Sequence, residues 1–190
     1  MSIRQSPART LDELQAQLRE ISERASALQA RVDSNSILQR PRPESWSVAE
    51  CIAHLDISNN AFFPIWDSEL ERAKGENLLA AAPYRLDFWG RILIWSMEPP
   101  PRFRVKAPQN IQPLNVGPTE QLFPGFLSRQ RQIMNTVEKA RGLAIDKIKI
   151  ASPVDTRIRY SIWASFCLTA THERRHLLQA EQAVQAVSSH

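Results

Sequence analysis

The chain has 190 residues, of which 43% are hydrophobic and 23% charged, and only five are glycine. This composition is typical of one globular domain, here residues 1–190, with a preference for helix. No apolar run approaches membrane-spanning length and residues 1–7 lack the apolar segment of a secretory signal, so we expect a cytoplasmic protein without a membrane partner.

The charge pattern argues against nucleic-acid binding. The net charge is +4, but the basic residues occur as scattered pairs rather than as one stripe with aromatic residues between them. A solvated helical surface accounts for this pattern, and we expect no nucleic-acid partner. The two cysteines, Cys51 and Cys167, each lie in a predicted helix and do not make a disulfide framework.

The first predicted helix spans about residues 10–34. Thr10 and Glu13 have the spacing of a capping box, which marks a helix start. Apolar residues then recur at steps of three and four and form a narrow seam, made of Leu11, Leu14, Leu18, Ile21, Ala25, Leu28 and Val32. Such a seam packs in a helical bundle, so we assign this helix a structural role.

A second helix is predicted after another capping box, formed by Ser47 and Glu50. Trp46 and Cys51 flank its start in the positions of a hydrophobic staple. The apolar pattern continues to about residue 70, although Pro64 should kink the helix or end it early.

His54 lies in the second turn of this helix, one turn after Glu50. A single histidine is more often a hydrogen-bonded core or surface residue than a metal ligand, so this position alone decides nothing. Glu50 is either a carboxylate that supports a site at His54 or only the capping partner of Ser47, and we favour the capping role.

Residues 75–118 are rich in proline and glycine and predict only short regular elements. Residues 87–95 are apolar and suit either a short helix or a strand. An irregular connection of this length usually covers part of its domain as a lid. Trp89, Trp95 and Phe103 could wall a substrate pocket or pack over the end of the helices, and the sequence leaves both open.

Two further helices complete the predicted set. One runs from Pro118 or Pro124 to Arg141, with Phe126, Ile133 and Val137 inward. The other covers residues 161–187, and its inward positions are Ile162, Ser165 or Phe166, Thr169, His172, His176, Gln179 and Ala183.

Polar residues on this last inward face mark a site. His172 and His176 are one turn apart on the same face, a spacing at which two imidazoles can chelate one metal ion. Buried polar groups without partners cost about 1–3 kcal/mol each, so an apolar bundle does not bury both imidazoles without a reason.

The last helix also contains the run His172-Glu173-Arg174-Arg175-His176, which fits the zincin protease motif H-E-x-x-H. In that motif the glutamate activates the metal-bound water. Three features argue against a zincin: only fourteen residues follow with one carboxylate among them, two arginines occupy positions that are usually buried, and no strand-rich segment precedes the helix.

Two motifs together resemble the DinB-like (YfiT-like) metalloenzymes. Trp46 to Leu55 is similar to the W-[ST]-x-x-E-x-x-x-H-L helix start of that family, and His172 to Gln179 is similar to its C-terminal H-x-x-x-H-x-x-Q helix. The connecting segments Lys106-Ala107-Pro108 and Ser152-Pro153 also resemble the family, so the similarity covers most of the chain.

The resemblance implies a particular all-α fold, a four-helix bundle of right-handed up-down-down-up topology. A long irregular excursion would join its second and third helices. The resemblance also implies that His54, His172 and His176 hold one divalent metal ion. Three imidazoles with one open position suit catalytic zinc, and nickel, iron or manganese are alternatives because nitrogen ligands discriminate poorly among them.

Characterised relatives in this family transfer a group to or from a low-molecular-weight thiol, and the resemblance implies the same class of reaction on a small-molecule substrate. Glu50 and Glu173 are then the candidate bases, and Gln179 would orient a ligand or substrate. Arg174 and Arg175 either bind the carboxylates of such a thiol or are solvated.

Two alternatives remain open for the function: a metal-dependent hydrolase, and a metal-binding or interaction module without turnover. A homodimer is a further expectation.

Overall fold

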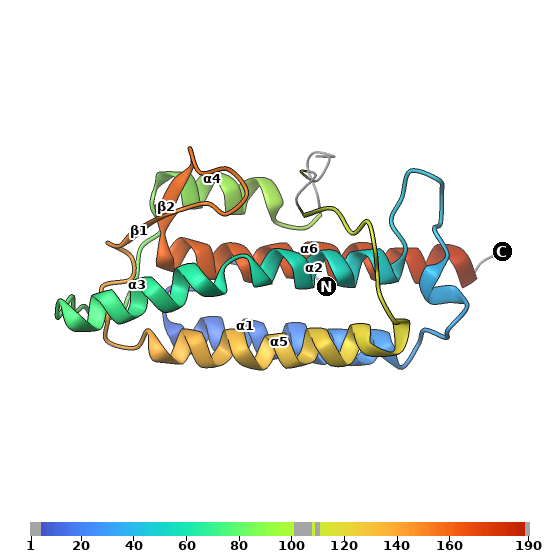
Figure 1. The fold of residues 1–190 in the computed structure, drawn as a ribbon, viewed down its shortest axis with the longest axis horizontal. Coiled ribbons are helices and arrows are strands. Elements are labelled where there is room, and N and C mark those ends of the chain that lie inside the picture. Colours follow the sequence, from blue (N-terminus) through green and yellow to red (C-terminus); the bar gives the residue numbers. More distant parts are fainter. Residues whose placement is uncertain (1–4, 101–107, 109–110, 189–190) are drawn as a thin grey trace.

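The computed structural model describes residues 5–100, 108 and 111–188. Most of them are helical, which confirms the predicted all-α class (Figure 1). The elements in chain order are α1 (Leu11–Gln29), the 3-10 helix η1 (Ser36–Leu38), α2 (Val48–Asn60), α3 (Phe63–Gly75), α4 (Phe88–Met97), α5 (Thr119–Lys139), β1 (Lys149–Ala151), β2 (Arg159–Ser161) and α6 (Ile162–Ser188).

Side-chain caps begin α1 and α2, as predicted. The Thr10 hydroxyl accepts a hydrogen bond from the backbone N–H of Glu13 (3.1 Å), although Glu13 accepts its own bond from the N–H of Arg9 (2.6 Å). Ser47 and Glu50 form the complete capping box. α1 ends at Gln29, short of the predicted end at residue 34, because the chain already turns there toward η1.

The long helices lie side by side, and α1 and α2 each pack against both α5 and α6. α1 and α6 run in one direction, whereas α2 and α5 run in the opposite direction (Figure 1). Contacts between α1 and α6 confirm that these two helices are parallel, because residue numbers increase together along both. Gln17 accepts a hydrogen bond from Arg174, and seven residues later Arg24 forms an ion pair with Glu181.

α2 and α3 form a rod that is broken at residues 61–62 and runs antiparallel to α6. Pro64 lies in the first turn of α3, so the predicted helix does end early and a new one starts. His54 in α2 meets His172, whereas Trp66 in α3 donates its indole N–H to the Ser165 hydroxyl (2.8 Å). As the chain advances along the rod from His54 to Trp66, its partner on α6 moves back from His172 to Ser165, which is the pattern of antiparallel helices.

The core lies between these helices. The α1 seam is buried except for Val32, which packs at its edge, and Phe126, Ile133 and Val137 of α5 are buried as predicted. A helix with a single inward face would leave its other side exposed, but the first part of α6 is buried on all sides. Every residue from Ser161 to Thr171 is buried, because α4 covers the side of α6 that the other helices leave open.

Within the predicted segment 87–95, residues 88–95 are helical rather than extended, and they form most of α4. Asp87 caps this helix by accepting from the N–H of Gly90 (2.8 Å), and its other oxygen accepts from Lys149 and from the N–H of Ser161. Trp89 and Trp95 are 44% and 55% exposed, so neither is a buried wall of a pocket. Phe103, Lys106 and Ala107 lie outside the described residues.

The connection between α5 and α6 contains a hairpin that the sequence did not predict. β1 and β2 pair antiparallel with Ile150 opposite Tyr160, and strands of three residues are too short to give a recognisable pattern. The two cysteines are buried and free, which agrees with the absence of a disulfide framework. None of the described helices has both the length and the apolar character that crossing a bilayer requires.

Gly90 provides a test of the contact between α4 and α6. A Cβ added at Gly90 would lie 2.6 Å from the Cβ of Ala164, so α4 would have to move away from α6. We expect Gly90→Ala to lower the free energy of unfolding by about 1–3 kcal/mol, measured by urea denaturation. Gly125→Ala is the matched control, because a Cβ at that position in α5 meets nothing within 4 Å. Alanine there should be neutral or stabilising, and equal losses in both variants would contradict close packing at Gly90.

Candidate metal centre

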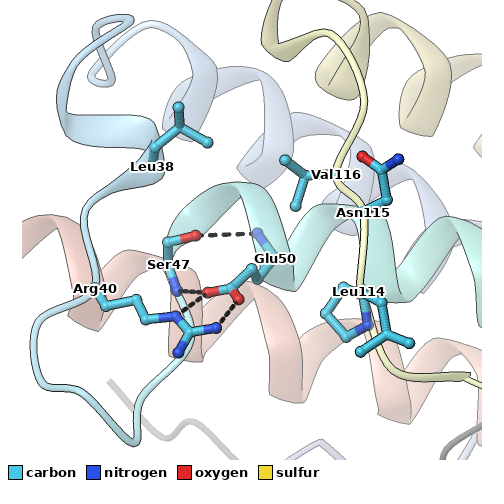
Figure 2. A pocket seen from close by; sticks show the side chains of 8 residues that line it. Leu38, Arg40, Ser47, Glu50, Leu114, Asn115 and Val116 are labelled. Atoms are coloured by element: carbon cyan, nitrogen blue, oxygen red, sulfur yellow. Dashed lines mark hydrogen bonds and ion pairs between the residues drawn. The ribbon is translucent and has the colours of Figure 1, made fainter.

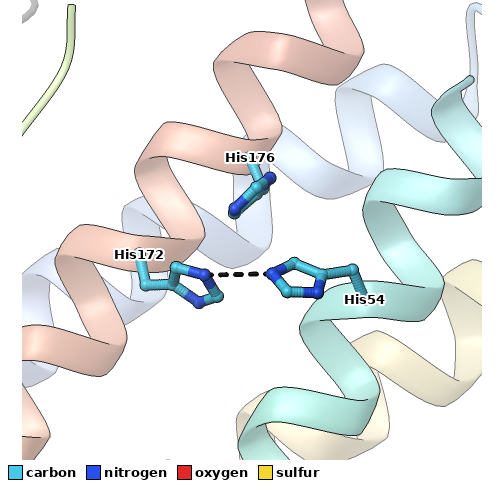
Figure 3. A group of neighbouring side chains, drawn as sticks. All are labelled: His54, His172 and His176. Carbon is cyan, nitrogen blue, oxygen red and sulfur yellow. Dashed lines mark hydrogen bonds between the residues drawn. The ribbon is translucent and has the colours of Figure 1, made fainter. Parts of the chain in front are cut away.

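Three histidines meet between α2 and α6 (Figure 3). His54 extends from α2, and His172 and His176 extend from successive turns of α6, with the three candidate ligand atoms within 4.8 Å of one another. The Nε2 atoms of His54 and His172 are 3.1 Å apart. Two nitrogens bound to one tetrahedral zinc at 2.0–2.1 Å lie about 3.3 Å apart, so this spacing suits a shared ion. No other Cys, Asp or Glu side chain of the described residues joins the group.

The backbone carbonyl of Ile111 determines the tautomer of His54. It lies 2.7 Å from His54 Nδ1, and a carbonyl only accepts hydrogen bonds, so Nδ1 carries the proton. The Nε2 atom of neutral His54 then presents a lone pair toward His172. A hydrogen bond of this kind to the second ring nitrogen is the usual support of a metal-bound histidine.

Burial keeps the three imidazoles neutral. Desolvation is the main cause that lowers the pKa of His54, and the hydrogen bond to Ile111 only partly opposes it. Burial likewise lowers the pKa of His172 and His176, and the positive charge of Arg175 adds to both shifts. Neutral imidazole is the form that binds metal, so the site is set for a cation at neutral pH.

Trp46 forms an aromatic wall beside the site. Its ring centroid lies 4.8 Å from that of His54 and 5.6 Å from that of His176, onto which it stacks. The sequence assigned Trp46 to a hydrophobic staple and gave no sign of this contact. The contact covers the imidazoles with an apolar surface and limits the access of water.

Four buried polar atoms on the turns of α6 that carry the histidines have no hydrogen-bond partner within the described part of the chain. They are the hydroxyl of Thr169, Oε2 of Glu173, Nε of Arg174 and Nδ1 of His176. Gln179, one turn after His176, makes a polar contact that partly opposes the lowering of the pKa of His176. An unsatisfied buried imidazole nitrogen is costly unless a ligand binds it, which supports a metal site here.

Glu173, a candidate base from the sequence, is fully buried. Its Oε1 accepts from the side-chain amide of Asn59 (2.7 Å) and from that of Gln130, which ties α6 to both α2 and α5. Burial raises the pKa of Glu173 to about 7, against the opposing effect of these hydrogen bonds. Neither Asn59 nor Gln130 was identified from the sequence.

The two adjacent arginines have different surroundings. Arg174 is buried and donates to Glu98 (2.7 Å), Thr171 and Gln17, so its charge is already paired and it is not solvated. Arg175 is half-buried and donates to the carbonyl of Ser96 (3.4 Å), and its charge acts on His172 and His176. Of the two candidates for binding an anionic group, Arg175 is therefore the one placed beside the histidines.

Glu50 is engaged at the start of α2 (Figure 2). Its carboxylate accepts from the Ser47 N–H (2.9 Å) and pairs with Arg40 at the edge of a surface cavity of about 330 Å³. Although burial alone would raise its pKa, the bonds from Arg40 and Ser47 lower it. Since a carboxylate with a lowered pKa is a weak base at neutral pH, these contacts favour the capping role of Glu50.

The fold and this cluster define the chain as an all-α protein with three histidines gathered between two antiparallel helices. No family model matches the sequence, and no curated protein or solved structure is significantly similar to it.

The raised pKa of Glu173 predicts a pH-dependent stability. The folded protein holds this proton more tightly than the unfolded chain, so the contribution is present below the unfolded value of 4.5 and is lost as pH rises through about 7. Glu173→Gln lacks this term. Between pH 4.5 and pH 8 metal-free wild type should lose as much as about 3 kcal/mol of unfolding free energy relative to Glu173→Gln.

Glu50→Gln is the control for this experiment, because the pKa of Glu50 is shifted in the opposite direction to that of Glu173. Because the pKa of Glu50 is lowered, wild type should lose stability relative to that variant only as pH falls below 4.5. A constant difference between wild type and Glu173→Gln from pH 4.5 to pH 8, in urea titrations, would show that Glu173 is not neutral in the fold.

Proposed function

We propose that the chain is a DinB-like metalloenzyme that transfers a group to or from a low-molecular-weight thiol. The antiparallel and parallel contacts of α1, α2, α5 and α6 support the four-helix, up-down-down-up arrangement that this resemblance implies. The irregular segment around α4 corresponds to the excursion between the second and third bundle helices. A cytoplasmic location and a homodimer remain predictions of the sequence.

One observation carries the proposal, the convergence of His54, His172 and His176 as neutral imidazoles, two of them buried and His172 partly buried. Together they would hold one divalent ion, with zinc expected and nickel, iron or manganese as alternatives. When bound, the ion would act as a Lewis acid that lowers the pKa of a coordinated water or thiol.

The residues around the histidines perform the other tasks. Ile111 holds His54 in the tautomer with an unprotonated Nε2, and Gln179 supports His176. Trp46 shields the imidazoles, and a dry surface of this kind strengthens electrostatic interactions at the site. Arg175 supplies a positive charge to which the carboxylate of a small thiol can bind.

The first test of the proposal is metal binding. His54→Ala, His172→Ala and His176→Ala should each weaken binding by more than about 100-fold, since even the loss of a partner outside the ligand set costs 10–100-fold. His190→Ala is the control and should keep wild-type affinity. Quenching of Trp46 fluorescence by Co²⁺ gives the readout, with Trp46→Phe as the background, and full affinity in His54→Ala would remove α2 from the site.

The same titration has an expected pH dependence. Because burial lowers the pKa of all three imidazoles, binding should persist below 6.5, where free histidine becomes protonated, and should fail only at lower pH.

The second test is thiol transfer. Metal-loaded protein is mixed with a chloro-dinitroarene and, in separate samples, with glutathione, bacillithiol, mycothiol or cysteine. In the expected reaction a C–S bond forms as chloride leaves and the thiol proton passes to buffer. Conjugation should exceed the spontaneous rate and be lost in His176→Ala.

Cysteamine separates the proposed role of Arg175 from the chemistry, because it is cysteine without the carboxylate. Arg175→Ala should raise KM for cysteine by about tenfold and leave KM for cysteamine unchanged. Hydrolysis of an ester or amide without any thiol-dependent rate would favour a metal-dependent hydrolase. Metal binding with neither activity would favour a non-catalytic module.

A further inference from the structure

The outer face of α4 presents large apolar side chains to solvent. Phe88, Trp89 and Ile92 are 68%, 44% and 39% exposed, and the rings of Phe88 and Trp89 lie edge to face with centroids 5.5 Å apart. Arg91 is exposed among them, and α4 has no acidic residue. Large apolar side chains that gather on an exposed face often mark an interaction site.

The packing of α4 does not allow this face to turn inward. Gly90 and Ile94 are the buried residues of the helix, and Gly90 approaches Ala164 of α6 too closely for any larger side chain. The cap by Asp87 also fixes the start of α4 to the hairpin and to Ser161. The exposed residues are therefore held on the outside.

Positive charge surrounds the face. Arg85 precedes α4 and Arg159 lies on β2, which packs against α4. Within the described part of the chain, no carboxylate side chain forms an ion pair with Arg85, Arg91 or Arg159. The nearby acidic residues are each paired with a cation: Asp87 with Lys149, Asp155 with Arg157, and Asp146, which also accepts from the backbone N–H of Arg85, with Lys147.

We propose that the outer face of α4 is a docking surface for an anionic lipid bilayer. The helix would lie in the plane of the membrane, with Phe88, Trp89 and Ile92 inserted among the headgroups. Aromatic side chains favour this depth, and nearby arginines are attracted to anionic lipid. This proposal replaces the expectation of no membrane partner, because the lack of a spanning run and of a signal-like segment does not bear on binding to a membrane surface.

Charge favours a bilayer over a second copy of the chain. A two-fold pairing through this face would bring the arginines around it in one copy close to those in the other, and like charges across an interface are unfavourable. α4 lies on the outside of the bundle, over α6 (Figure 1).

Docking would bring the bilayer near the histidines. At the other end of α4, the carbonyl of Ser96 accepts from Arg175, and Glu98 pairs with Arg174. Both arginines lie between His172 and His176, so α4 connects the proposed surface to the turn of α6 that carries the site. The proposal itself does not depend on a bound metal.

The test is co-sedimentation of the full chain with vesicles of phosphatidylcholine, alone or mixed with phosphatidylglycerol. We expect binding to the mixed vesicles only, and weaker binding as ionic strength rises. Arg91→Glu and the double variant Trp89→Ser/Ile92→Ser should each lower the partition coefficient by at least about tenfold. Circular dichroism would verify that the variants are folded.

Leu38→Ser/Leu114→Ser is the matched control, because both leucines are highly exposed (51% and 85%) but lie away from α4 beside the cavity at the start of α2. This variant should bind like wild type. Absence of binding to mixed vesicles, or equal loss in the control and the α4 variants, would overturn the proposal. A dimer that depends on α4 and ignores vesicles, seen by sedimentation equilibrium, would assign the face to a second copy instead.

Discussion

The contact between α2 and α6 is the constraint on which the rest of the structure depends. It places His54 beside His172 and Asn59 beside Glu173, within a core that is otherwise mainly apolar. Buried polar groups are stable only with partners, so both pairings must be satisfied at once. A shift of one residue between these helices would separate both pairs. Polar contacts, in addition to apolar packing, therefore fix the register of α6.

α4 makes this arrangement possible by covering the remaining side of α6. Its C-terminal end supplies Glu98, which neutralises Arg174 in a buried ion pair. Arg174, which directly follows the buried Glu173, can thus stay buried instead of having to reach solvent. Such a pair offsets the cost of burying the charge but adds little net stability, so its main effect is to hold α4 against α6.

Helix starts and the histidines could be predicted from the sequence because their signals are local. Thr10 and Ser47 act on residues three positions away, and His172 and His176 are fixed by helical spacing. Gln130 also had a signal, as it lies on the inward face of α5 between Phe126 and Ile133, but its partner depends on tertiary register. The hydrogen bond between His54 and the carbonyl of Ile111 could not be predicted from the sequence, because any residue offers a backbone carbonyl.

Burial favours the neutral form of the histidines and of Glu173 on α6. It lowers the pKa of the histidines and raises that of Glu173, so each neighbour favours its neutral form. Three neutral imidazoles would leave the charge of a divalent ion uncompensated, unlike thiolate or carboxylate ligands. With Arg175 adding to the positive potential, an anionic ligand such as hydroxide or thiolate would be favoured at the remaining position. With a metal bound as proposed, this donor set would connect burial of the helix contact to activation of a nucleophile.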